Sequence, residues 1–263
     1  KDPDLSFFYN YSTVNLYLKN KNTSRFDLLF GLIPTNSIEG KQLFVSLDFT
    51  AELLNKLGYG EYLFVNFERL RPEQQMFEQS ELCDQANWKL LTETLLEGYH
   101  IKALHKNTFY PYGLDNVNLV ETFGANSRVI FPFRRIEKLR DIPPIERRID
   151  GAMTSVYHLF PNASVAVLSK HTSLAILEPL SPSSSQWVVY RMINRQTEDH
   201  AISREDAQRD ALFVNETGQD EDREAACAIQ ETVETRANDH LTFGYFEKTI
   251  VNFHQHLSEY LVK

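Results

Sequence analysis

The sequence predicts an α+β domain in which helices cover one face of an antiparallel β-sheet. Five strand candidates follow one another between residues 127 and 194, separated by short turns rich in Pro, Asn and Ser. Three amphipathic helices follow between residues 203 and 262. Consecutive strands with short turns pair antiparallel, and flanking helices bury their apolar faces on the sheet. We expect the sheet to curl around the last helix and to leave a ligand cavity there.

The first part of the chain has weaker signals. The first forty residues alternate aromatic-rich runs with turns rich in Asn and Lys, which indicates an irregular start that contains strands. Residues 41–49 and 61–68 have the composition and alternation of strands. Residues 50–58 between them are predicted to form a short helix that Thr50 caps and Gly58 ends. Helical character returns over residues 83–100.

The later elements carry clearer patterns. The strand candidates are residues 127–136, 154–160, 164–169, 173–180 and 186–194, and the helices are residues 203–214, 220–235 and 245–262. The first strand candidate contains the Arg134–Arg135 pair. This pair could bind an anion, but we favour an arginine-rich sheet edge that prevents edge-to-edge pairing.

Composition excludes several classes of function. The 263 residues are 42% hydrophobic and 24% charged, with a formal net charge of −9, as in ordinary soluble globular proteins. No apolar run approaches the roughly 18–20 residues of a membrane-spanning helix, and the negative charge disfavours nucleic acid and anionic lipid as partners. Cys83 and Cys227 are the only cysteines, so a reducing cytoplasm is the expected location. Nucleotide-binding glycine loops and the nucleophile elbow of serine hydrolases are absent from the sequence.

Residues 93–105, ETLLEGYHIKALH, combine two carboxylates with two histidines. Glu93, Glu97 and His100 are spaced i, i+4 and i+7, which predicts one face of a helix. Five further residues of unbroken helix would rotate His105 by roughly 140° from His100. The two histidines can therefore share a metal ion only if the helix ends or is distorted between Gly98 and His105.

A third metal ligand must come from elsewhere in the chain. Two histidines and one carboxylate on one face of an Fe(II) ion would leave roughly three positions for oxygen and substrate. The best-placed acids open the helix predicted at residue 220: Asp220, Glu221, Asp222 and Glu224. Acidic residues in the first turn of a helix also interact favourably with the helix dipole without any metal. In that interpretation, one histidine would be a core residue and the other a surface residue. Spacing alone leaves both interpretations open.

Residues 87–105, NWKLLTETLLEGYHIKALH, resemble the catalytic-domain signature of Rieske-type non-haem iron oxygenases, in which Asn-Trp-Lys leads into an acidic helix and a His-x4-His pair. Residues 60–68, 221–235 and 245–261 resemble further segments of that family in the right order. The resemblance spans roughly residues 31–263. It implies a curved antiparallel sheet wrapped on a long C-terminal helix, the helix-grip fold of the START/Bet v 1 type.

The resemblance also implies a role for each matching residue. His100 and His105 become iron ligands, and Asp222, opposite Gln230, becomes the third. Glu97 takes the place of the acidic residue that bridges to the electron-donating cluster of a neighbouring subunit, so it should lie at a subunit interface.

Two further residues are implied to act beside the iron. Glu93 is expected to support the site, as an acceptor of an imidazole N–H, together with Tyr99. Thr94 stands where the family usually has Asn, which places a shorter hydroxyl near the iron and changes how substrate or oxygen is positioned.

A larger departure concerns the Rieske cluster, which needs two Cys and two His in Cys-x-His and Cys-x2-His pairs. Neither cysteine of this chain has a histidine at those spacings. We therefore interpret residues 1–82 as a remnant of, or junction to, a cluster domain, and residues 83–263 as a mononuclear iron domain. Electrons would come from a 2Fe–2S cluster in a partner or a missing domain: a cluster-bearing subunit, or a ferredoxin and reductase.

The implied reaction is O2-dependent hydroxylation, dihydroxylation or oxidative demethylation of a small organic substrate, in a homo- or hetero-trimer or hexamer. The alternative is a degenerate paralogue without a cluster, which serves as a structural or regulatory subunit or binds an apolar ligand. The missing cluster favours the alternative, and the intact set of ligands opposes it.

Overall fold

The computed structural model describes residues 74–261, except 115, 148, 150, 195–200, 217–219 and 239, together with the backbone of four earlier strands. Those strands form one antiparallel sheet in chain order: β1 (Leu5–Asn10), β2 (Thr13–Leu18), β3 (Asp27–Gly31) and β4 (Phe44–Asp48). β4 lies within the strand predicted at residues 41–49. The predictions for residues 50–58 and 61–68 fall outside the described residues.

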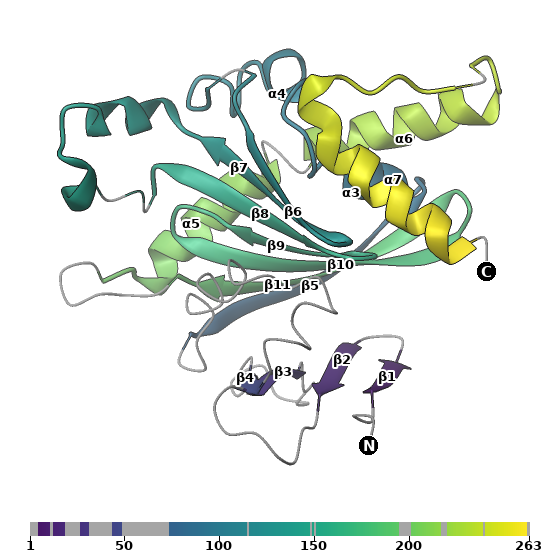
Figure 1. Cartoon of the computed structure of the whole chain (residues 1–263), viewed down its shortest axis with the longest axis horizontal. Helices are drawn as coiled ribbons and strands as arrows, with labels where there is room; N and C mark the ends of the chain where they lie inside the picture. The colour runs from purple at the N-terminus through teal and green to yellow at the C-terminus, as the bar shows by residue number, and fades with distance from the viewer. Residues whose placement is uncertain are drawn as a thin grey trace.

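The main sheet has seven antiparallel strands in the order β5-β11-β10-β9-β8-β7-β6 (Figure 1). From β6 to β11 each strand pairs with the next along the chain, and β5 is added beside β11. The strands are β5 (Met76–Asp84), β6 (Leu119–Phe123), β7 (Asn126–Pro132), β8 (Met153–Leu159), β9 (Ala163–Val167), β10 (His171–Ser181) and β11 (Ser184–Ile193). The strands predicted between residues 154 and 194 are therefore confirmed as β8 to β11.

The strand predicted at residues 127–136 is only partly right. β7 ends at Pro132, and Arg134–Leu139 form the 3-10 helix η2. Proline has no N–H to continue a strand ladder, so the chain turns away from the sheet there. Arg134 and Arg135 consequently do not lie on a sheet edge, and the proposed protection against edge pairing is wrong. The edges of this sheet are β5 and β6.

The predicted helices 203–214, 220–235 and 245–262 are confirmed as α5 (Arg204–Val214), α6 (Asp220–Glu234) and α7 (Lys248–Leu261), the last preceded by the 3-10 turn η5 (Tyr245–Glu247). A further 3-10 turn, η3, covers Pro144–Glu146. α5 contacts β10 and β11, whereas α7 contacts β6 and β7. Of the helices in the described residues, none is long and apolar enough to cross a bilayer.

The helix predicted over residues 83–100 is largely wrong. Cys83 and Asp84 end β5, α3 covers only Trp88–Glu93, and α4 covers His100–Ala103. Asn87 starts α3, because its side chain accepts a hydrogen bond from Lys89 N at 3.0 Å. The expected domain boundary between residues 82 and 83 falls inside β5, so the sheet includes residues on both sides of it.

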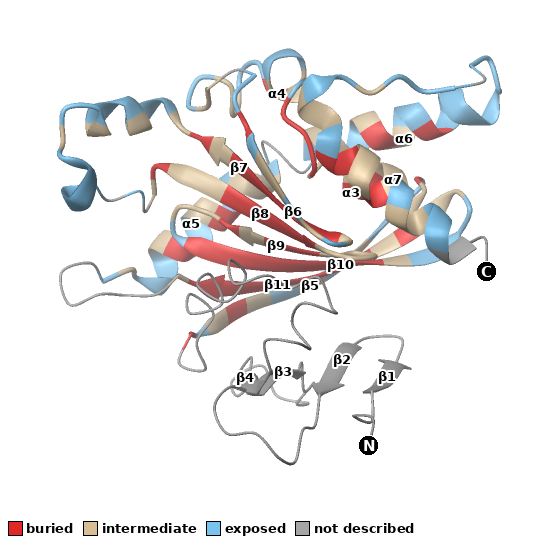
Figure 2. Ribbon diagram, viewed as in Figure 1, coloured by how far each residue is buried: buried red, intermediate tan, exposed pale blue. Residues whose placement is uncertain are grey.

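Buried side chains line the middle strands and the helix faces that meet them (Figure 2). One core cluster joins the sheet to α3 and α6 through Leu91, Leu177, Trp187, Val189 and Ala226, among others. Each fully buried side chain of leucine size contributes about 1.5–3 kcal/mol. α3 and the start of α6 are thereby held on the sheet.

His158 in β8 is buried in a second cluster beside α7. Its ring packs edge-on against Phe253 with the ring centroids 5.2 Å apart, and Nε2 lies 3.0 Å from the carbonyl oxygen of Pro161. Burial lowers the pKa of His158 to about 4, although the hydrogen bond to Pro161 opposes this shift. The ring is therefore neutral in the folded protein at neutral pH.

We expect His158 to destabilise the fold as the pH falls. Below the unfolded pKa of about 6.5, the unfolded chain binds a proton that the folded chain does not, and the cost grows to about 3 kcal/mol near pH 4. His158→Gln keeps an N–H for Pro161 and does not titrate, so urea unfolding between about pH 7 and pH 4.5 should show a shallower loss of stability. Equal pH slopes for the two proteins would contradict this assignment.

Candidate metal centre and cavity

The structure brings His100, His105 and Asp222 together. One ligand atom from each lies within 4.8 Å of the others, and no other such group of His, Cys, Asp or Glu occurs within the described residues. Asp222 Oδ1 lies 3.4 Å from His100 Nε2 and 3.0 Å from His105 Nε2. His100 begins α4, His105 follows its C-terminal cap, and Asp222 lies in the first turn of α6.

The chain leaves helical geometry between the two histidines, as predicted. α4 ends at Ala103 with Leu104 as its cap, so His105 lies beyond the helix. The expected common helix face for Glu93, Glu97 and His100 is wrong, because α3 ends at Glu93 and turns separate it from α4.

The carboxylate of Glu97 holds both the start of α4 and the ring of His100. It accepts hydrogen bonds from the backbone N–H groups of Tyr99 and His100 and contacts His100 Nδ1. Because Nδ1 is engaged in this way, Nε2 is the ring nitrogen that faces Asp222. Glu97 is only 9% exposed in the isolated chain and lines the adjacent cavity.

The second histidine has an equivalent support that the sequence did not reveal. His105 Nδ1 lies 2.6 Å from Glu221 Oε2, and Thr108 Oγ1 donates to the same oxygen at 2.8 Å. Burial would lower the pKa of His105, but the neighbouring carboxylates of Asp222 and Glu221 outweigh it and raise this pKa. The only signal for Glu221 was its position beside the predicted ligand.

The donor set fits a divalent iron ion. Asp222 Oδ1 is buried and accepts no hydrogen bond of acceptable geometry, which is costly for a carboxylate unless a cation satisfies it. Two imidazole Nε2 atoms face this oxygen, and two histidines with one carboxylate form the facial set of non-haem Fe(II) sites.

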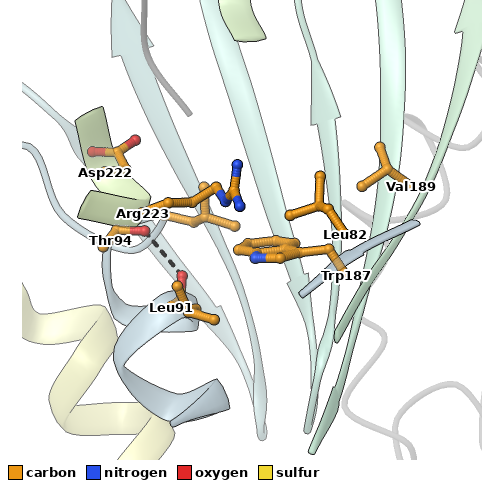
Figure 3. A pocket seen from close by; sticks show the side chains of 8 residues that line it. Leu82, Leu91, Thr94, Trp187, Val189, Asp222 and Arg223 are labelled. Atoms are coloured by element: carbon orange, nitrogen blue, oxygen red, sulfur yellow. Dashed lines mark hydrogen bonds between the residues drawn. The ribbon is translucent and has the colours of Figure 1, made fainter. Parts of the chain in front are cut away.

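The other predicted site residues have different contacts. Glu93 does accept an imidazole N–H, but from His254 Nε2 of α7 at 2.7 Å rather than from a candidate ligand. Thr94 Oγ1 donates to Leu91 O at 2.9 Å (Figure 3). Thr94 also lines the adjacent cavity. Tyr99 is 37% exposed, and its hydroxyl accepts a hydrogen bond from Phe246 N.

A buried ion pair fixes the start of α6 on β5. Asp84, 6% exposed, accepts hydrogen bonds from Arg223 Nη2 at 2.6 Å and from Trp187 Nε1 at 2.8 Å. Figure 3 shows Arg223 extending from α6 toward Trp187, while Asp222 lies on the other side of the helix turn. Trp187, Asp222 and Arg223 help to line a hole of about 20 Å³, which has room for roughly one water. This pair therefore fixes the rotation of α6 that directs Asp222 to the histidines.

A cavity of about 530 Å³ opens beside the three candidate ligands. Its walls come from the segment between α4 and β6, from β7 to β9, and from α5; they include Phe109, Phe131, Phe133, Val156, Leu168 and Phe213. No described residue of α7 lines it. The expected position of the cavity at the last helix is wrong, because α7 packs on β6 and β7 instead.

Comparison with known proteins identifies similar domains. The family model of the ring hydroxylating alpha subunit (catalytic domain) matches residues 73–263. The quaternary ammonium Rieske monooxygenase CntA, in complex with the inhibitor MMV12, is similar with a TM-score of 0.60 and 14% identity over 82% of this chain and 58% of that chain. Dicamba monooxygenase bound to dicamba gives a TM-score of 0.51 with 11% identity over 72% of this chain and 58% of that one.

Naphthalene 1,2-dioxygenase from Rhodococcus sp. bound to indole gives a TM-score of 0.53 with 15% identity over 82% of this chain and 64% of that one. No curated protein sequence matches significantly. The chain thus spans 58–64% of the length of these three structures. At such low identity the likeness concerns the fold, in particular the curved sheet with helices on one face.

We expect the purified chain to carry close to one iron per molecule. His100→Ala, His105→Ala and Asp222→Ala should each lose it, because a three-ligand site then keeps only two protein donors. Glu224→Ala is the matched control, since Glu224 lies in the same helix but is exposed. Iron content of anaerobically purified protein measures this. If Asp222→Ala keeps its full iron content while Glu221→Ala or Asp220→Ala loses its iron, Asp222 is not the third ligand.

We expect Arg223→Gln to lower the free energy of unfolding of the metal-free protein by about 3–5 kcal/mol, because it leaves the buried carboxylate of Asp84 without its cation. Arg209→Gln breaks a comparable pair with Asp206, but Arg209 is largely exposed, so the loss there should stay below about 1 kcal/mol. Urea unfolding of the three proteins gives both values. Similar losses in the two variants would show that the Asp84 pair does not fix α6.

Proposed function

Because the chain belongs to the ring hydroxylating alpha subunit family through the catalytic domain that matches residues 73–263, we propose that it is the catalytic part of a mononuclear non-haem Fe(II) oxygenase. The observation that carries this proposal is the group of His100, His105 and Asp222 beside a cavity of about 530 Å³. The similar solved structures are two monooxygenases and one dioxygenase.

Fe(II) would be held by the Nε2 atoms of His100 and His105 and by the carboxylate of Asp222. Bound there, it would supply the redox chemistry that transfers oxygen from O2 to a carbon atom of a small organic substrate, as hydroxylation, dihydroxylation or oxidative demethylation. Glu97 and Glu221 keep both rings oriented, since each occupies the Nδ1 atom of one histidine.

The cavity residues would bind the substrate and exclude water. Aromatic and aliphatic side chains form most of the wall, which suits an apolar substrate body. The hydroxyl hydrogen of Thr94 is used by Leu91 O, so we assign Thr94 a role in positioning rather than in proton transfer. Glu93 supports the site indirectly, because its hydrogen bond to His254 joins α3 to α7.

Electrons are proposed to come from a 2Fe–2S Rieske cluster outside residues 73–263, in a cluster-bearing subunit or by way of a ferredoxin and reductase. Glu97 is the proposed link to this donor, since its carboxylate touches the ring of His100. The same proposal includes a trimeric or hexameric assembly with Glu97 near a subunit interface. It also includes the helix-grip classification of the fold, with α7 as its long helix.

The apolar cavity also supports the second candidate, a degenerate paralogue that binds an apolar ligand without turnover or serves as a structural or regulatory subunit. The buried Oδ1 atom of Asp222, which accepts no hydrogen bond, favours the iron enzyme, because a bound metal cation would satisfy this oxygen. Absence of iron from anaerobically purified protein would support the paralogue.

We expect the iron-loaded chain to give no sustained oxidation with NADH and a reductase, because neither of its cysteines lies in a cluster motif. Hydrogen peroxide carries both oxygen and reducing equivalents and should give a few turnovers, measured as hydroxylated product by mass spectrometry. Glu97→Gln should preserve the peroxide reaction but abolish turnover that an added cluster-bearing partner restores. Sustained NADH-driven oxidation without such a partner would refute the proposal.

A further inference from the structure

Two arginine side chains line the cavity, and from them we infer the class of substrate: small organic acids whose carboxylate binds Arg134 and Arg135 while an apolar body extends toward the candidate metal ligands. The choice of substrate rests on the proposed function, but acid binding itself requires no iron. Both arginines begin η2 directly after β7 and line the cavity together with His100, His105 and Asp222.

The two guanidinium groups have no carboxylate partner among the described residues. Ion pairs of arginine in that part of the chain involve Arg128, Arg191, Arg209 and Arg223. Arg134 Nη2 instead donates to Tyr110 O at 3.4 Å, and Arg135 Nη2 donates to Ser169 Oγ at 2.9 Å. These neutral contacts orient the side chains and leave their positive charge for a ligand. A guanidinium group is well suited to a carboxylate, which it can bind through paired hydrogen bonds.

Each of the two arginines already lies against an aromatic ring. The Arg134 guanidinium lies 5.2 Å from the centroid of Tyr110, and that of Arg135 lies 4.7 Å from the centroid of Phe133. A cationic ligand that approached these two rings would meet the repulsion of the guanidinium groups. The surroundings of the two arginines therefore favour an anion over a quaternary or primary ammonium group.

Three carboxylates also line the cavity: Glu97, Asp210 and Asp222. Oδ2 of Asp210 accepts hydrogen bonds from Lys170 N at 2.9 Å and from His171 Nδ1 at 2.8 Å, so this oxygen is already used by the protein. Glu97 and Asp222 face the two candidate histidine ligands instead of the arginines.

The candidate metal centre brings negative charge to the same cavity. Asp222 and Glu97 both line it, and Glu221 lies behind His105. A substrate carboxylate would be repelled by these groups and attracted to the arginines. Phe109, Phe131 and other apolar side chains also line the cavity and would surround an apolar body. This difference in charge would orient an acid with its carboxylate at the arginines and its apolar body toward the site of oxidation.

Calorimetric titration of the metal-free chain can test this. The probes are phenyl-substituted carboxylic acids of increasing chain length, each compared with its neutral amide. We expect at least one acid to bind about tenfold more tightly than its amide, and Arg134→Gln and Arg135→Gln each to remove most of that preference. Amide affinity should change less than about twofold, which shows that the variants keep the cavity intact. Arg140→Gln is the matched control, because Arg140 is exposed, as Arg134 and Arg135 are, but lies outside the cavity.

The inference is overturned if no acid binds more tightly than its amide, or if trimethyl(3-phenylpropyl)ammonium binds more tightly than the acids. It is also overturned if Arg140→Gln weakens acid binding as much as the two cavity variants do. Because iron takes no part in the titration, a chain that binds acids but retains no iron would refute the oxygenase proposal alone. Iron retention without any preference for acids would refute only the inference about the substrate.

Discussion

The site depends on how α4 ends between the two histidines, because five residues of unbroken helix would turn His105 roughly 140° away from His100. α4 ends at Ala103, and Glu97 fixes where this helix begins. The Glu97 carboxylate accepts hydrogen bonds from the first N–H groups of α4 and at the same time holds the His100 ring. Gly98 next to it permits close packing, since a Cβ there would lie 3.3 Å from Phe131 Cε1 of β7. The carboxylate of Glu97 thus fixes both the backbone at the start of α4 and the orientation of the His100 ring.

Asp222 reaches the histidines only because α6 is held in a fixed rotation on the sheet. A buried ion pair is a weak source of net stability, since desolvation offsets much of the attraction, but its geometry is specific. Asp84 accepts hydrogen bonds from Arg223 and Trp187, which an apolar pair of the same volume would not reproduce. Gln230 adds a second tie, because its side chain accepts a hydrogen bond from Asn87 N at the start of α3. The helix that carries Asp222 is therefore tied both to the sheet and to the helix that precedes the histidines.

The parts of the fold that the sequence predicts well are those where burial follows a regular period. The strands β8 to β11 and the helices α5 to α7 have such patterns. β5 was missed because, as an edge strand, it buries only Phe77 and Asp84 fully, and its other positions are polar or half-buried. The long helix predicted over residues 83–100 is wrong because Leu91 and Leu95 have helical spacing and pack in one core cluster, whereas Leu96 enters a different cluster from a turn.

The candidate site likewise contains residues that the sequence indicates locally and residues that it does not. His100, His105 and Asp222 could be predicted through the resemblance, because local motifs carry them. Glu221 as the partner of His105, and Arg134 and Arg135 as cavity residues, depend on where distant elements meet and have no local signal. These contacts also determine the electrostatics of the site. Asp222 and Glu221 outweigh the burial of His105 and raise its pKa, so without a metal the ring holds its proton more tightly than a free histidine. A divalent cation at Nε2 would displace this proton and take over the compensation of both carboxylates. The charge that favours protonation of His105 is thus the same charge that would stabilise a bound metal ion.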